Sequence, residues 1–135
     1  MPRAYFVTLV GESGAGKSTL SYALALALAT GQSFLNRTPT RPERVLYFDD
    51  ENAEIDQEGY LKDLWRGMGR PNMGLLEQHL FIEHLTLGSQ NWPTVAKACI
   101  DACRPALIVV DTAITSCPPP PNSLGENDNA SATRQ

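Results

Sequence analysis

The sequence has no apolar run long enough to cross a membrane. Its longest such run, residues 20–29, is interrupted by Ser21 and Tyr22 and is about half the ~20 residues that a spanning helix needs. The first four residues, Met-Pro-Arg-Ala, also lack the apolar stretch of a secretory signal. We therefore expect a cytoplasmic protein without a membrane partner.

Cysteine and positive charge are scarce as well. The three cysteines are Cys99, Cys103 and Cys117, and no two of them have C-x-x-C spacing, which favours buried thiols over a zinc or redox site. The net charge of -4 argues against a nucleic-acid surface spread over this chain, because such surfaces are usually basic. A local basic patch, or DNA contacts made by residues outside this chain, would still be compatible with that charge.

The length and the order of apolar segments indicate one modest α/β domain. A chain of 135 residues is enough for one domain and not for two. β-prone runs at residues 5–10, 44–49, 80–85 and 106–111 predict four strands. Helical patterns over residues 17–30, 54–68, 73–79 and 93–104 lie between the strands. The alternation predicts a parallel sheet flanked by helices, with right-handed crossovers.

The residues between the first predicted strand and the first predicted helix form a phosphate-binding loop. Residues 11–18 fit G-x-x-x-x-G-K-S/T at every fixed position. Glycines let such a backbone curl so that successive N–H groups point at phosphate oxygens, and the helix start adds its positive dipole end. Lys17 can reach the β- and γ-phosphates, and the Ser18 hydroxyl can ligate Mg²⁺. The nucleotide-binding residues that we expect are Gly11, Glu12, Ser13, Gly14, Ala15, Gly16, Lys17, Ser18 and Thr19.

Acidic residues follow two of the predicted strands, at the sheet edge where α/β proteins bind ligands. Asp111 ends the apolar strand L-I-V-V-D, and we expect it to hold Mg²⁺ opposite Ser18. Asp49, Asp50 and Glu51 end the second strand, where a carboxylate could orient the attacking water or simply form a solvated acidic loop. Asp49 and Asp50 are the weaker candidates, because like charges this close disfavour several ionised groups at one metal.

Other polar and aromatic residues are expected to play structural roles. His79 and His84 lie before and inside the third predicted strand, far in sequence from the loop, and we expect neither to take part in chemistry. Trp65 and Trp92 are expected to pack rather than to stack on bases.

Three segments together resemble one known family. G-E-S-G-A-G-K-S-T, R-V-L-Y-F-D-D-E-N and P-A-L-I-V-V-D-T are similar to the motifs of the RecA-like AAA ATPases, most closely the RepA-type helicase branch. The resemblance implies MgATP hydrolysis coupled to DNA-related work, with Lys17 and Glu51 catalytic and Ser18 and Asp111 at the metal. It assigns Asp111 and Thr112 to Walker B. It also implies a ring-like homo-oligomer in which a neighbouring subunit supplies an arginine.

The family's fold continues beyond Walker B with a further helix and a sensor strand. In the family that strand lies between the P-loop strand and the Walker B strand, which are therefore expected to be separated here. On this basis we expect residues 1–117 to be a partial P-loop NTPase domain, truncated after Walker B. The four prolines at 118–121 and the polar residues after them predict a loop or tail over residues 118–135.

The sequence is also compatible with two other functions. A small-molecule kinase would use Asp49 or Asp50 to bind an acceptor hydroxyl, although Arg66, Arg70 and Arg104 are too scattered to form a lid. A nucleotide-binding fragment without turnover is the other alternative. A GTPase is disfavoured, because the sequence contains no N-K-x-D tetrapeptide and no D-x-x-G after Val110.

Overall fold

The computed structural model describes residues 4–12, 14–50, 54–84 and 90–111. Within these ranges the predicted α/β fold is confirmed, with a parallel sheet flanked by helices. The elements run in the order α1 Lys17–Thr30, β1 Val45–Asp49, α2 Glu54–Gly67, α3 Met73–His79, β2 Leu80–Glu83, α4 Trp92–Cys103 and β3 Leu107–Asp111.

The sheet has the strand order β2-β1-β3, and both pairings are parallel. All five residues of the central strand β1 are buried. Val45 pairs with Leu80 on one side, and Asp49 pairs with Asp111 on the other. Since parallel strands run in the same direction, the acidic ends of β1 and β3 lie side by side at one edge of the sheet.

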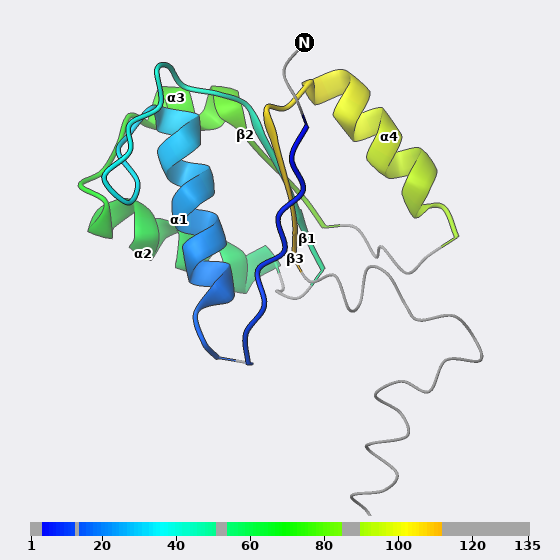
Figure 1. Ribbon diagram of the computed structural model, residues 1–135, viewed down its shortest axis with the longest axis horizontal. Coiled ribbons are helices and arrows are strands. Elements are labelled where there is room, and N and C mark those ends of the chain that lie inside the picture. The colour runs from blue at the N-terminus through cyan, green and yellow to red at the C-terminus, as the bar shows by residue number, and fades with distance from the viewer. Residues whose placement is uncertain (1–3, 13, 51–53, 85–89, 112–135) are drawn as a thin grey trace, which may run out of the picture.

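Helices cover both faces of the sheet, with α1, α2 and α3 on one face and α4 on the other (Figure 1). Side chains alternate across a strand, so Val45 and Tyr47 pack against α1 while Leu46 and Phe48 pack against α4. The first core contains buried α1 residues such as Tyr22. The two cores fix β1 between α1 and α4 and thereby fix the strand ends that carry the acidic residues.

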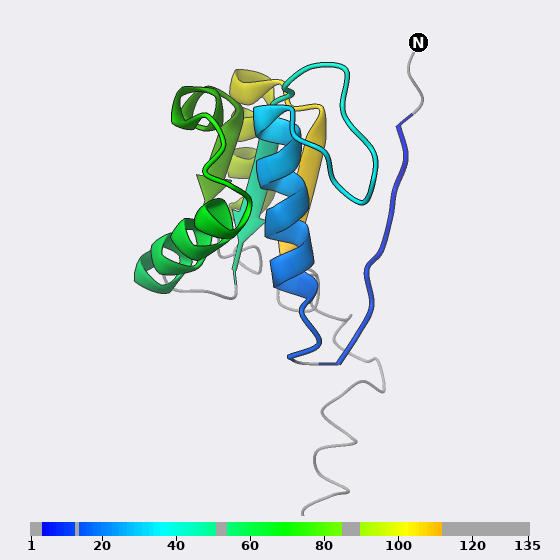
Figure 2. The ribbon, with the colours of Figure 1, turned by 90° about the vertical axis from the view of Figure 1, so that its left-hand side faces the viewer.

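The prediction of a first strand at residues 5–10 is wrong in this structure. Among the described residues the sheet contains only β1, β2 and β3, and Tyr5, Phe6 and Val10 are 83–93% exposed. Figure 2 shows the segment running apart from the three strands. A strand needs a neighbour to accept and supply its backbone hydrogen bonds, and β propensity alone does not replace that neighbour.

Smaller differences concern the ends and the burial of elements. The strand expected at residues 80–85 ends at Glu83, so His84 follows it rather than lying inside it.

Cys99 and Cys103 pack into the core under α4, as expected for small apolar side chains. No helix in the described ranges combines the length and the apolar content that crossing a bilayer requires.

The end of α1 gives a stability prediction. Gly31 caps the helix at φ 74, and a Cβ there would meet the Pro42 ring at 3.3 Å. A left-handed conformation costs an L-residue about 1–2 kcal/mol, so Gly31→Ala should lower the free energy of unfolding by at least that amount, measured by urea titration. Gly59→Ala is the matched control, because Gly59 lies inside α2 with no atom within 4 Å of its added Cβ. The control should stabilise by up to ~1 kcal/mol; equal losses in both variants would contradict the account of Gly31.

Candidate nucleotide site

The phosphate loop turns through left-handed glycines before α1 begins. Gly14 has φ 79 and Gly16, the N-cap of α1, has φ 95, conformations that favour glycine. The Ala15 N–H donates to the Glu12 carbonyl at 3.1 Å, and the Leu20 N–H donates to the Gly16 carbonyl at 3.0 Å. The loop is thus curled over the start of α1, where unpaired helical N–H groups and the helix dipole attract anions. Ser13 lies outside the described residues.

Lys17 folds back over this loop. Its Nζ donates to the backbone carbonyls of Gly11 and Glu12, at 2.8 Å for Glu12. The ammonium group therefore lies on the loop rather than in bulk solvent beyond it. The sequence pattern predicts that this ammonium group contacts the oxygens of a bound polyphosphate.

The side chains of Ser18 and Asp111 meet directly. Ser18 lies in the first turn of α1 and Asp111 ends β3, 93 positions later, and the Ser18 Oγ donates to the Asp111 Oδ2 at 2.7 Å. The strand delivers the carboxylate to the carboxyl edge of the sheet, and the loop delivers the hydroxyl to the same point. The two residues that the sequence predicts as metal ligands are therefore adjacent in space.

The chemistry of this pair fits Mg²⁺. Hydroxyl and carboxylate oxygens are hard ligands, and Mg²⁺ is usually held by one or two such groups together with substrate phosphates and water. No group of three or more His, Cys, Asp or Glu side chains in the described part of the chain could hold a metal. Ser18 and Asp111 could hold Mg²⁺ together with nucleotide phosphates and water.

A second hydroxyl also reaches Asp111. Tyr47, fully buried in β1, donates its Oη to the same Oδ2 of Asp111 at 2.8 Å. Burial, and then the hydrogen bond to Asp111, raises the pKa of Tyr47 far above its ordinary value. Its phenol is therefore a neutral donor at physiological pH. Tyr47 was not among the site residues predicted from the sequence; the available signal was its position two residues before Asp49, on the same strand face.

Asp49 is enclosed rather than turned toward a ligand. It is 1% exposed and accepts hydrogen bonds from the Tyr22 phenol and, at 3.5 Å, from Gln57 Nε2. Gln57 also donates to the Tyr22 Oη at 2.8 Å and contacts His84 Nε2. Burial, and then the hydrogen bond to Asp49, raises the pKa of Tyr22. Asp49 therefore belongs to a buried polar network between α1, α2 and β1, which the sequence analysis also missed.

The comparisons with known proteins give a family. A family model described as an AAA domain matches residues 1–134. The chain belongs to this family. Membership places it among the AAA-type P-loop ATPases, which bind ATP together with Mg²⁺. No curated protein and no solved structure matches the sequence.

Other predicted residues of the AAA domain have clear positions. Thr19 follows Ser18 on α1, and its hydroxyl hydrogen-bonds with the Tyr60 phenol of α2. Glu12 is exposed on the loop. The Asp50 N–H donates to the Asp111 carbonyl at 2.8 Å, which ties the end of β1 to the end of β3. Glu51 lies outside the described residues, so its predicted role as base stays a prediction.

The remaining polar and aromatic candidates make local contacts. His79 Nδ1 contacts the Leu75 carbonyl within α3, and Trp65 Nε1 donates to the Pro71 carbonyl at 2.8 Å. Both hydrogen bonds are to backbone carbonyls a few residues away in the chain, and neither involves the phosphate loop.

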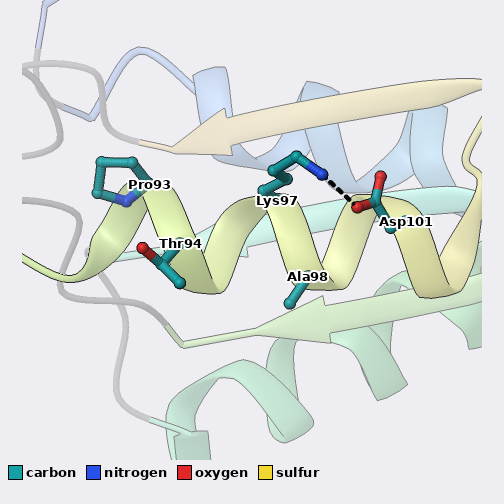
Figure 3. Close-up of a pocket in the computed structure, with 5 residues that line it drawn as sticks. All are labelled: Pro93, Thr94, Lys97, Ala98 and Asp101. Carbon is teal, nitrogen blue, oxygen red and sulfur yellow. Dashed lines mark hydrogen bonds and ion pairs between the residues drawn. The ribbon is translucent and has the colours of Figure 1, made fainter.

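A shallow hollow of about 400 Å³ lies on α4 of the AAA domain (Figure 3). Its lining is Pro93, Thr94, Lys97, Ala98 and Asp101. Lys97 and Asp101 form an exposed ion pair of 2.7 Å along one helix face. None of these residues belongs to the phosphate loop or to a strand end, so the hollow is separate from the nucleotide site.

Proposed function

We propose that this AAA domain binds MgATP at residues 11–19 and hydrolyses it, in the manner of RecA-like ATPases. The observation that carries the proposal is the 2.7 Å contact between Ser18 and Asp111. It brings a loop hydroxyl and a strand-end carboxylate together at the N-terminus of α1. A glycine-rich turn before a helix that bound nothing would not require such a carboxylate.

Each residue has a role in this proposal. The backbone amides of the loop and Lys17 bind and orient the phosphates, while Ser18 and Asp111 hold the metal. Mg²⁺ supplies charge neutralisation at the β- and γ-phosphates when it is bound. We assign Glu51 as the residue that orients and deprotonates the attacking water, on the basis of its position after β1 and the family resemblance.

The wider role is part of the same proposal. The motifs resemble most closely the RepA-type helicase branch, and on that ground we propose coupling to DNA-related work in a cytoplasmic ring-like homo-oligomer. Because the chain carries a net charge of -4, we propose that DNA is contacted by a local basic patch or by residues outside this chain.

The kinase alternative receives less support. It would need Asp49 or Asp50 to bind an acceptor hydroxyl, and the Asp49 carboxylate is buried and hydrogen-bonded to Tyr22 and Gln57. Nucleotide binding without turnover is the alternative that the experiment below separates from ATP hydrolysis.

Asp111→Asn tests the proposed site. The substitution removes the charge but keeps a side-chain oxygen, so it should abolish most of the gain in ATP affinity that Mg²⁺ provides and reduce phosphate release by about 100-fold. The measurements are titration of a fluorescent ATP analogue with and without Mg²⁺, and single-turnover phosphate release from ATP.

Asp101→Asn is the matched control, because Asp101 is exposed on α4 and pairs only locally with Lys97. It should leave both measurements unchanged. Mg²⁺-dependent affinity that persists in Asp111→Asn would contradict the metal assignment. Binding by the unsubstituted protein without any phosphate release would select the alternative without turnover.

A further inference from the structure

We propose that Tyr47 is a positioning residue that fixes the Asp111 carboxylate for the metal. The inference rests on the proposed function, since it concerns the metal that accompanies ATP. Two hydroxyl groups donate to one oxygen of Asp111. Ser18 Oγ lies 2.7 Å and Tyr47 Oη lies 2.8 Å from Asp111 Oδ2.

The strand register explains how Tyr47 reaches Asp111. Tyr47 pairs with Val109, and Asp49 pairs with Asp111. Because side chains alternate along each strand, Tyr47 and Asp111 lie on the same sheet face, diagonally across two strands. The long Tyr47 side chain spans this diagonal, since its Oη lies 2.8 Å from Asp111 Oδ2.

The Tyr47 ring is held rigidly. It stacks on the Tyr22 ring with centroids 4.1 Å apart and an interplanar angle of 6°, and both side chains are fully buried. Tyr22 belongs to α1, the helix that also carries Ser18. The stack therefore links α1, which carries Ser18, to β1, whose Tyr47 contacts Asp111 at the end of β3. The two phenols serve different carboxylates, since Tyr22 contacts Asp49 and Tyr47 contacts Asp111.

A rigid donor to one carboxylate oxygen limits the rotation of that carboxylate. Partners of metal ligands act in this way, and their loss typically costs about 10–100-fold in metal affinity or activity. In this protein the rigid donor is Tyr47, and the second proposed metal ligand, Ser18, donates to the same oxygen of Asp111. Removal of the Tyr47 hydroxyl should therefore act on the metal requirement rather than on the phosphate contacts of the loop.

The test compares Tyr47→Phe with Tyr22→Phe in the full chain. Both substitutions keep the stacked ring and delete one buried hydroxyl: that of Tyr47 donates to Asp111, and that of Tyr22 donates to Asp49. The readout is a Mg²⁺ titration of fluorescent ATP analogue binding. Tyr47→Phe should raise the Mg²⁺ midpoint about tenfold or more while binding without metal is unchanged. Tyr22→Phe should leave the midpoint unchanged, because the hydroxyl that it removes contacts Asp49 and Gln57.

A double variant isolates the route of the effect. If Tyr47 acts through Asp111, adding Tyr47→Phe to Asp111→Asn should shift the midpoint no further than Asp111→Asn alone, since coupled residues are not additive. Circular dichroism at the assay temperature checks folding. A Tyr47→Phe protein that is unfolded while Tyr22→Phe is folded would show a structural role and overturn the inference.

The remaining outcomes also decide between the two proposals. Equal Mg²⁺ midpoints for Tyr47→Phe and the unsubstituted protein, with Mg²⁺-dependent binding intact in both, would overturn the role of Tyr47 and leave the proposed function standing. Absence of nucleotide binding by the unsubstituted protein at any Mg²⁺ concentration would overturn both.

Discussion

Lys17→Ala should remove measurable MgATP binding. The ammonium group of Lys17 lies on the phosphate loop, against the carbonyls of Gly11 and Glu12. A hydrogen bond to a charged group contributes about 1.5–3 kcal/mol, and contacts to two phosphates would together weaken binding by about 100-fold or more when lost. Titration of a fluorescent ATP analogue measures this loss, and phosphate release should fall to the background rate.

Lys97→Ala is the control for that substitution. Lys97 is an exposed lysine on α4 whose ammonium pairs with Asp101 at 2.7 Å, so its removal changes the net charge equally without touching the loop. ATP affinity should be the same in Lys97→Ala as in the unsubstituted protein. If Lys97→Ala weakened binding as much as Lys17→Ala, the effect would be one of overall charge and the loop assignment would be wrong.

Glu51→Gln should separate binding from hydrolysis. Glutamine has nearly the shape of glutamate but cannot accept a proton, so MgATP should bind with unchanged affinity while the rate of hydrolysis falls. General bases typically contribute about 10²–10⁴-fold, and the single-turnover rate of phosphate release should fall by that amount.

The matched substitution is Glu77→Gln, on the exposed side of α3, which should hydrolyse ATP at the normal rate. A normal rate in Glu51→Gln would show that another group activates the water. Loss of ATP affinity in Glu51→Gln would instead indicate that Glu51 contacts the nucleotide or its metal.

The parts of the site that depend on local chemistry were predictable from the sequence. The pattern of residues 11–18 specifies a curled loop because Gly14 and Gly16 adopt positive φ angles. The Ala- and Leu-rich segment Lys17–Thr30 forms the predicted helix and ends at Gly31. Asp111 was predictable because α/β proteins bind ligands at the carboxyl ends of parallel strands, and Asp111 is the last residue of an apolar strand.

The contacts that depend on tertiary packing were not predictable. Tyr22 and Tyr47 appeared only as members of a helix and a strand, and nothing in their local sequence indicates that their rings stack. Asp49 was predicted only as a weaker strand-end candidate beside Glu51, yet its carboxylate is enclosed by Tyr22 and Gln57. Those partners come from α1 and α2, so their approach depends on how two helices pack on the sheet.

The predicted strand at residues 5–10 shows the limit of propensity. Tyr5, Phe6, Val7 and Val10 have the composition of a buried strand, but they are exposed, and no strand among the described residues pairs with them. Pairing is a property of two segments, whereas composition describes one.

Isothermal titration calorimetry of the protein with MgATP tests the central assignment most directly. A loop that grips polyphosphate through its amides, Lys17 and Ser18 should give a saturable binding heat, which should vanish in Lys17→Ala and weaken when EDTA removes Mg²⁺. If neither MgATP nor MgGTP produced a heat above that of dilution, the assignment of residues 11–18 as a nucleotide site would be contradicted.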